Sequence, residues 1–510
     1  MVFLTSRQKH AKKPPIVFTN FLRWRPKYTR SPTLLLFALA LLTPAVLLVH
    51  GYHPLADDGA IYVAGVKRLA NPSLYPSDSV FAVAPTRLSI FAHILAPLLR
   101  WGSLPLLLLL CHLASIFLYL AGAWSMAGRM FSSRSAAWGA LLLAACAFTL
   151  PVAGTSLSIM DPYVTARSFS TPLMLFALSE ILAERWALAV VWLALGALLH
   201  PLMAAYMAIA MLTLALSQRK IWRSLAAVCA LGWLAATLIF ILTCHVDANT
   251  AYSRAALSRS YFFLSSWQWF EYLGLVFPLL LLGFAGARIR EAWSARAVAI
   301  AATVTGGCAL LVSLCFVHRS GSLWMARLQP LRAFQFVYLA GVLLAGGWLA
   351  KHKRALALVC LVLIGSLFTG QRLTYPESNH VEWPNARPRN RWQEAFLWIR
   401  VHTPNDAIFG LDNNYIEGSG EDALGFRATA ERSAIADWYK DGGIAANFPQ
   451  AATLWWRGAQ ATAELNRAND DQRLARLRPL GVSWIVLPAA TATRFWCPYV
   501  NFEVKVCKLE

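Results

Sequence analysis

Charged residues are scarce in this sequence. Only 14% of the 510 residues are Asp, Glu, Lys or Arg, while 58% are hydrophobic; a soluble globular protein has roughly 25% charged residues. Several apolar runs reach about 17 to 24 residues, which is enough to cross a hydrocarbon core of roughly 30 Å. Because these runs are continuous and do not alternate, the sequence predicts a polytopic α-helical membrane protein and argues against a β-barrel.

Acidic residues are fewer than basic ones, and the distribution of charge along the chain indicates which kinds of molecule the protein binds. The chain has 25 Asp and Glu against 46 Lys and Arg, for a net charge of +21. From Gln371 onward the chain has 16 basic and 16 acidic residues. The part before Gln371 therefore contains 30 basic and 9 acidic residues. Many of these basic residues lie in short loops between apolar runs, where they orient a membrane protein. The pattern predicts membrane lipids as partners and no nucleic acid.

The apolar runs predict about 11 membrane spans with the N-terminus inside and the C-terminus outside. The predicted inside segments hold 20 Lys and Arg and the outside loops before Gln371 hold 10, which sets this orientation. No small-residue cleavage site follows the first run, so it reads as a retained signal anchor. The spans are predicted at residues 34–49, 104–126, 136–150, 171–182, 186–199, 202–216, 225–243, 272–287, 298–316, 334–349 and 356–368.

Three parts of the chain follow from this topology. Residues 1–33 form a basic cytoplasmic N-terminus, and residues 34–369 form the transmembrane domain, whose long first outside loop covers residues 51–103. Two helices at the membrane surface are expected within that loop. Residues 370–510 form a small extracytoplasmic α/β domain, large enough for its own core. Its helices are predicted at residues 391–401, 451–468 and 470–477, and its strands at residues 407–411, 433–438, 482–487 and 502–507.

Cysteine is rare in the C-terminal domain. Cys497 and Cys507 are its only two cysteines. Outside the cytoplasm the two residues can form a disulfide that closes a short terminal loop, and two free thiols are the alternative.

Two adjacent carboxylates, Asp57 and Asp58, come soon after the first predicted span. One Asp ahead of Gly59-Ala60-Ile61 serves as a helix N-cap. A second Asp beside it adds charge repulsion, and paired carboxylates are typical of a general base or a metal site. The pair is therefore a candidate catalytic site at the outer membrane surface.

Further polar residues are expected on the same side of the membrane. Asp161-Pro162 follows the third predicted span, with Arg167 in the same loop; Asp before Pro is also a common helix start. His200-Pro201 lies at an outer turn, where Pro breaks the helix and His serves either as a cap or as a site residue. His53 precedes the acid pair and has the same two interpretations.

The loop at residues 318–332 is the strongest basic cluster outside. It contains Arg319, Arg327, Gln329 and Arg332, and three Arg at this place run against the positive-inside bias. Guanidinium groups bind phosphate through paired hydrogen bonds. Contact with lipid headgroups and binding of a substrate phosphate are the two interpretations.

The layout resembles the C-type glycosyltransferase (GT-C) superfold. Asp57 and Asp58 match its acidic position in a long first outside loop, and Asp161 matches its second acidic motif. The opening of its outer domain is similar to Trp392, Trp398-Ile399-Arg400 and Thr403-Pro404-Asn405-Asp406-Ala407. A largely uncharacterised bacterial branch of the superfold is similar at the linker Tyr75-Pro76-Ser77-Asp78, at His200-Pro201 and at Phe426-Arg427 with Glu431-Arg432-Ser433.

The resemblance implies a glycosyltransferase of the bacterial inner membrane that uses a polyprenyl-phosphate-linked sugar and inverts the anomeric centre. Asp57 is then the general base, and Asp58 and Asp161 orient it or bind a divalent cation, Mg or Mn. Arg327 and Arg332 hold the phosphate, with His200, Arg319, Gln329 and Arg167 as further binding candidates.

The competing hypothesis is a non-catalytic scaffold or transporter whose outer domain binds a partner. Ion-coupled transporters carry ionisable residues at mid-membrane, and the predicted helix interiors have almost none, Glu180 near an inner end being the main exception. A scaffold is not excluded in this way. Carboxylates of Asp57 and Asp161 that face one cavity favour the enzyme, whereas carboxylates that each cap a separate helix favour the scaffold.

Overall fold

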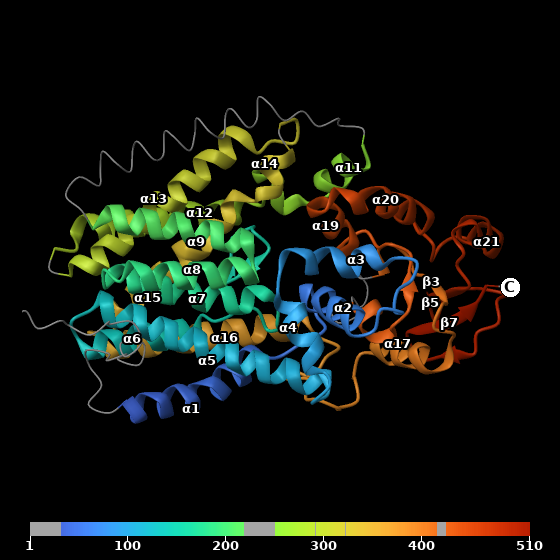
Figure 1. The fold of residues 1–510 in the computed structure, drawn as a ribbon, viewed down its shortest axis with the longest axis horizontal. Coiled ribbons are helices and arrows are strands. Elements are labelled where there is room, and N and C mark those ends of the chain that lie inside the picture. Colours follow the sequence, from blue (N-terminus) through green and yellow to red (C-terminus); the bar gives the residue numbers. More distant parts are fainter. Residues whose placement is uncertain (1–31, 219–249, 291, 322, 416–424, 510) are drawn as a thin grey trace, which may run out of the picture.

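The computed structural model describes residues 32–218, 250–290, 292–321, 323–415 and 425–509. Long helices lie side by side in one half of the molecule, and a smaller domain with a sheet forms the other half (Figure 1). The predicted span at residues 225–243 and the basic segment before Pro32 lie outside the described residues.

Most of the described chain before residue 375 is helical. The long and medium helices of this part are α1 (Pro32–His50), α5 (Leu104–Met130), α6 (Arg134–Cys146), α7 (Ala166–Leu182), α8 (Trp186–Leu199), α9 (Pro201–Ser217), α12 (Trp269–Arg288), α13 (Trp293–Phe316), α15 (Phe334–Leu349) and α16 (Lys353–Thr374). Shorter helices are α2 (Asp58–Ala70), α3 (Ser79–Val83), α4 (Phe91–Leu98), α11 (Ala251–Leu257) and α14 (Leu323–Leu328), and a small ribbon pairs β1 (Pro151–Val152) with β2 (Leu157–Ser158).

Within the described residues, six helical segments are long and apolar enough to cross a membrane, which makes this a multi-pass membrane protein. They are Thr33–His50, Leu104–Met130, Trp269–Arg288, Trp293–Phe316, Leu323–Leu349 and Lys353–Thr374. The bent pair Ser79–Leu88 and Phe91–Leu98 would make a seventh span if counted as one, and α6, α8 and α9 are shorter apolar helices. A total of about 11 spans stays a prediction.

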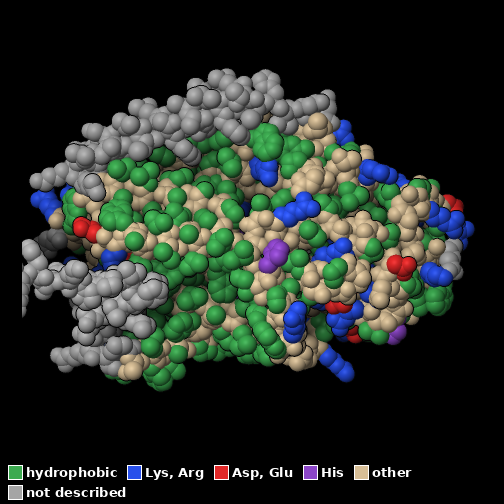
Figure 2. All heavy atoms as spheres, in the orientation of Figure 1, with side chains coloured by type: hydrophobic (Ala, Val, Ile, Leu, Met, Phe, Trp, Pro, Cys, Tyr) green, Lys and Arg blue, Asp and Glu red, His purple; other side chains and the backbone are tan. Residues whose placement is uncertain are grey.

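Small residues allow the helices to pack closely. A Cβ atom on Gly139 of α6 would lie 2.4 Å from the backbone oxygen of Gly346 on α15, so only glycine permits this crossing. On the outside of the bundle, α16 has no buried residue. Figure 2 shows hydrophobic side chains over much of the helical half of this face, whereas Lys and Arg gather toward the other half. A surface of apolar side chains is suited to contact with lipid.

The helices α2 and α3 lie between the bundle and the C-terminal domain (Figure 1). Arg427 of the domain forms ion pairs with Asp78, which precedes α3, and with Asp441, and Lys67 of α2 pairs with Glu431 at 2.6 Å. Because these charges are largely buried, loss of one partner would leave the other unpaired at considerable cost. The first loop and the C-terminal domain are thus held together by charge pairs.

The C-terminal domain has a five-stranded mixed sheet in the order β4-β3-β5-β7-β6, in which the first three strands are parallel and the remaining pairings are antiparallel. Its strands are β3 (Ile408–Gly410), β4 (Ser433–Ala434), β5 (Trp484–Pro488), β6 (Tyr499–Val500) and β7 (Val504–Lys508). Its helices are α17 (Arg391–His402), α18 (Phe426–Ala430), α19 (Lys440–Asn447), α20 (Ala452–Ala461) and α21 (Asp470–Leu477).

Several local predictions in this domain differ from the structure. The helix predicted at residues 451–468 ends at Ala461, because the chain turns there and Glu464 has a positive φ of 51°, which a continuing helix cannot contain. The strand predicted at residues 433–438 is paired only at Ser433–Ala434. The helices α18 and α19 were not predicted.

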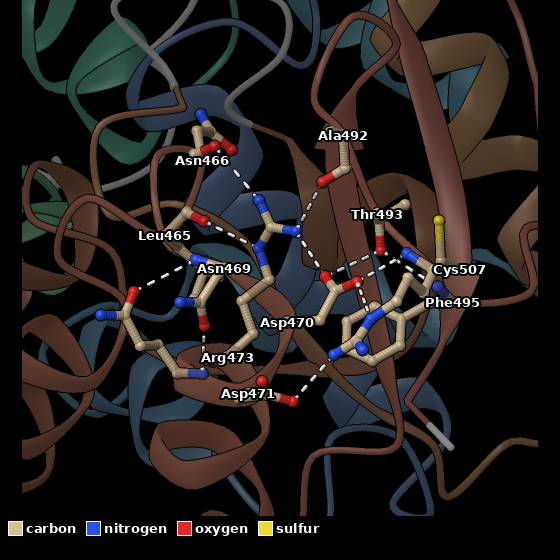
Figure 3. A network of polar contacts seen from close by, with 12 residues as sticks. Leu465, Asn466, Asn469, Asp470, Asp471, Arg473, Ala492, Thr493, Phe495 and Cys507 are labelled. Atoms are coloured by element: carbon tan, nitrogen blue, oxygen red, sulfur yellow. Dashed lines mark hydrogen bonds and ion pairs between the residues drawn. The ribbon is translucent and has the colours of Figure 1, made fainter.

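A polar network fixes the last part of the domain (Figure 3). The Asp470 carboxylate accepts hydrogen bonds from Arg473 at 2.7 Å, from the Thr493 hydroxyl at 2.9 Å and from the Arg494 backbone at 2.6 Å. A disulfide joins Cys497 and Cys507 just beyond it. Together they hold the loop before β6 against α21.

Candidate functional site

Asp57 sits where the chain enters α2, in an unusual backbone conformation. Its φ of 47° and ψ of −129° lie in a region that favours glycine, which costs a non-glycine residue about 1–3 kcal/mol and is typical of functional sites. Its side chain makes no helix-cap hydrogen bond. The helix-cap interpretation of the Asp57 carboxylate is therefore wrong.

Two side chains bind the Asp57 carboxylate instead. The Tyr163 hydroxyl donates to Oδ2 at 2.9 Å, and the Lys440 ammonium contacts Oδ1. The backbone of His53 donates to the Pro162 carbonyl at 2.8 Å, which ties this loop to the segment that carries Tyr163. A Cβ atom on Gly59 would lie 2.7 Å from the Pro54 oxygen, so glycine is required directly after the acid pair.

Lys440 lies on α19 of the C-terminal domain, 383 positions beyond Asp57. Burial lowers the pKa of its ammonium to about 7, and a contacting carboxylate favours the charged form. The next residue, Asp441, binds Arg427 through both carboxylate oxygens, at 2.8 and 2.9 Å. This pairing fixes the first turn of α19, from which Lys440 reaches the site.

Two cavities meet at Asp57. One has a volume of about 470 Å³ and the other about 410 Å³, both within the usual range for ligand pockets. Asp57, Ser156, Ser260 and Tyr261 line both of them. Asp58 lines the first cavity and Asp161 the second. Asp57 and Asp161 thus line one cavity, and Asp57 and Asp58 line the other.

The first cavity is basic. Arg259, Arg332, Lys440 and His200 line it together with Gln329. Arg332 forms no side-chain hydrogen bond or ion pair with any residue that the structure describes, and its Nε atom is buried. A buried guanidinium without a partner is costly, so Arg332 is suited to an anionic ligand.

Arg259 approaches the same cavity from the segment after α11. It donates to the Trp438 carbonyl at 2.7 Å and to the carbonyl of Tyr439. No carboxylate within the described ranges pairs with it, so its charge also stays available to the cavity. Sequence reasoning did not choose Lys440, because its neighbours in space are far away in the chain.

Asp161 does not cap a helix either. α7 begins at Ala166 and is capped by Thr165 and Ser168, whereas Asp161 is buried in an ion pair with Arg167. Burial raises the pKa of Asp161, the Arg167 guanidinium opposes that rise, and the Asp58 carboxylate adds to it. Arg167 also donates to the Ser158 carbonyl at 3.3 Å, so this pair supports the wall of the second cavity.

No three His, Cys, Asp or Glu side chains are grouped closely enough to hold a metal ion in the part of the chain that the structure describes. Asp57 and Asp161 are each bound to a cation as well. These donors do not fit a divalent cation without further ligands. The predicted Mg or Mn site on Asp58 and Asp161 stays a prediction, and no step below depends on it.

The other predicted residues are distributed between cavity and surface. His200 directly precedes α9 and accepts a hydrogen bond from the Met203 backbone at 3.4 Å. It therefore caps this helix while it also lines the first cavity. Gln329 lines this cavity and lies 3.3 Å from Asn447 of α19. Arg319 is exposed and bonds to Ser266, and Arg327 stacks on Trp324. Neither of these two arginines lines the cavities.

The His53 side chain contacts residues that lie outside the two cavities. Its Nδ1 atom lies 2.8 Å from Glu382, and its ring stacks on Tyr375 at 4.0 Å. Burial raises the pKa of Glu382 to about 8. These contacts join the first loop to the chain that follows α16, away from the two cavities.

Comparison with solved structures gives a likeness of low sequence identity. No family model matches the chain, and no curated protein matches its sequence. Among solved structures, the chain is similar to the archaeal oligosaccharyltransferase AglB from Archaeoglobus fulgidus in complex with an inhibitory peptide and a dolichol-phosphate. The sequence identity is 14% and the TM-score 0.45, over 90% of this chain and 69% of that chain.

Proposed function

We propose that this protein is a membrane glycosyltransferase that moves a sugar from a polyprenyl phosphate to a hydroxyl group of an acceptor. The observation that carries the proposal is the position of Asp57, which lies between a basic cavity and a hydroxyl-lined one and is held there by Tyr163 and Lys440. A general base must reach the proton of the acceptor hydroxyl while the oxygen of that hydroxyl reaches the carbon that is attacked, so a carboxylate between the two substrates suits this reaction.

The donor is assigned to the basic cavity. Its lining combines Arg332 and Arg259 with apolar side chains such as Leu88, Leu199 and Leu202. A lipid phosphate has the same two-part chemistry, an anion joined to a hydrocarbon chain. Guanidinium groups stabilise the negative charge that develops on a leaving phosphate.

The acceptor hydroxyl meets the donor at Asp57. Its proton passes to the Asp57 carboxylate as the hydroxyl oxygen forms a bond to the anomeric carbon. The bond from that carbon to the phosphate oxygen breaks, and its electron pair leaves with the phosphate toward Arg332. Attack opposite the leaving group inverts the anomeric centre.

Tyr163 and Lys440 prepare the base. Tyr163 orients one carboxylate oxygen through its hydrogen bond, and Lys440 keeps the carboxylate ionised before the acceptor binds. Asp58 belongs to the same cluster of charges in the first turn of α2. In the cell envelope, the site faces the outer side of the bacterial inner membrane, with the C-terminal domain extracytoplasmic.

Deletion of the gene tests the proposal. We expect loss of one surface glycan and accumulation of its lipid-linked precursor, measured by mass spectrometry of the lipid extract. Wild-type chain restores the glycan, and so does Asp471→Asn, because that carboxylate is 81% exposed and far from the cavities. Asp57→Asn does not restore it.

A scaffold gives the opposite pattern in the same strain. A non-catalytic partner-binding protein needs no base, so Asp57→Asn would then restore the glycan as well as the wild-type chain does. Restoration of the glycan by Asp57→Asn, or a deletion strain with no accumulated precursor, contradicts the proposed function.

A further inference from the structure

The second cavity differs in chemistry from the first. Its volume is about 410 Å³, and its described lining contains no Lys, Arg or His. Four serines line it, Ser156, Ser158, Ser260 and Ser266, together with Tyr163, Tyr261 and Trp267. Hydroxyl groups both donate and accept hydrogen bonds, so the lining is polar without a positive charge.

The carboxylates of this cavity are already engaged. Asp57 is bound by Lys440 and Tyr163, and Asp161 is paired with Arg167. Glu271 accepts a hydrogen bond at 2.6 Å from the Gln268 backbone at the start of α12. The remaining polar capacity therefore comes mainly from neutral hydroxyl groups.

Polar groups in this wall are left for a ligand. The Ser158 hydroxyl has no hydrogen-bond partner within the described ranges, although its backbone carbonyl binds Arg167. The indole N–H of Trp267 is buried and also lacks an acceptor among these residues. Trp267 is 8% exposed and packs flat against Gly154, where a Cβ atom would lie 2.4 Å from the ring. Buried donors without partners are rare in native proteins.

We propose that this cavity binds the acceptor and that the acceptor is a neutral carbohydrate. The inference rests on the proposed function, since Asp57 is the group that joins the two cavities. A neutral sugar offers many hydroxyl groups to the serines and an apolar face to Trp267. An anion would find no Lys, Arg or His in the described lining, because Lys440 and Arg167 are already paired with Asp57 and Asp161. A hydrocarbon chain would leave the serine hydroxyls unsatisfied.

Binding is measured directly by saturation-transfer NMR on the full chain in lipid nanodiscs. The probes are neutral methyl glycosides of hexoses, sn-glycerol 3-phosphate and a short serine-containing peptide. We expect saturation transfer to the glycosides, with at least a fivefold loss in Ser158→Leu, which fills the cavity from β2. Ser132→Leu, the same change at an exposed position in the loop between α5 and α6, keeps the wild-type signal.

A milder variant covers the case in which Ser158→Leu does not fold. Ser158→Ala removes only the hydroxyl and is expected to reduce the glycoside signal two- to threefold. Glycoside signals that neither Ser158 variant changes overturn the proposal, as does binding of only the peptide or only the glycerol phosphate.

The failure of this inference is separable from failure of the proposed function. Glycoside binding is measured without a donor and needs no chemistry, so it does not depend on the proposed role of Asp57 as a base. Loss of glycan transfer in Asp57→Asn together with glycoside signals that Ser158→Leu does not change would overturn the acceptor assignment alone. Glycan transfer that survives Asp57→Asn would overturn the proposed function alone.

Discussion

The two cavities share Asp57 but have opposite chemistry. Arg259, Arg332 and Lys440 line the first, whereas serines and tyrosines line the second and no Lys, Arg or His is among its described lining residues. The first suits an anion and the second a neutral ligand with hydroxyl groups. In the proposed function, one carboxylate then serves two substrates: Arg259 and Arg332 lie on the side where the phosphate leaves, and no Lys, Arg or His is in the described lining of the acceptor side.

The largest expected effect comes from the group that the cavities share. Asp57→Asn keeps the shape and removes the base, and loss of a general base costs about 10²–10⁴-fold in turnover. Sugar transfer by purified protein in liposomes measures it. Asp471→Asn serves as the matched control, and a variant that transfers sugar at the wild-type rate would remove Asp57 from the mechanism.

The second-largest effect is expected from a charged residue that lines only the first cavity. Arg332→Gln removes a guanidinium that has no partner among the described residues, so the leaving phosphate loses stabilisation and turnover falls by about 10²–10³-fold. Arg332→Lys retains the charge and is expected to recover part of the activity. The exposed Arg494→Gln is the control. An equal loss in Arg332→Gln and Arg494→Gln would argue against a specific phosphate site.

Lys440→Met changes the pH dependence rather than only the rate. Burial lowers the pKa of Lys440 to about 7, so the wild-type chain has this positive charge beside the Asp57 carboxylate mainly below neutral pH, where it favours the ionised base. In Lys440→Met, the acidic limb of the pH profile of kcat/KM is expected to move to higher pH, so activity falls most below neutral pH. Lys353→Met, at the exposed start of α16, leaves the limb in place. An unchanged acidic limb in Lys440→Met would show that this ion pair does not act on the base.

The smallest expected effect is that of Tyr163→Phe. It removes a single hydrogen bond of 2.9 Å to Asp57, and hydrogen bonds to charged groups contribute about 1.5–3 kcal/mol. Turnover is expected to fall about 10-fold or somewhat more, with unchanged folding by circular dichroism. A loss as large as that of Asp57→Asn would mean that Tyr163 takes part in the chemistry and does not only orient the base.

Much of the fold follows from local patterns in the sequence. Apolar runs predict most of the described membrane helices, and α21 begins and ends at the residues predicted for it. α19 was missed because Lys440-Asp441-Gly442-Gly443 has a weak helix pattern; Gly lowers helix propensity by about 1 kcal/mol, and α19 is held by the pairing of Asp441 with Arg427.

The candidate site was predictable only in part. Asp57 was found because it adjoins a second carboxylate, Asp161 because it is predicted on the same side of the membrane, and Arg332 because a cation on the predicted outer side is unusual. Lys440 could not be found in this way, since its role arises from contacts across the fold. The roles of Arg319 and Arg327 in phosphate binding stay predictions that the geometry does not favour, because neither lines a cavity.

The assignment of the two cavities is tested most directly by a cryo-EM map of the full chain in nanodiscs with a bound polyprenyl phosphate. The account predicts phosphate density in the basic cavity, within hydrogen-bond distance of Arg332, and an empty cavity beside Ser158 and Trp267. Phosphate density in the serine-lined cavity, or only on the lipid-facing surface of the helices, would contradict it.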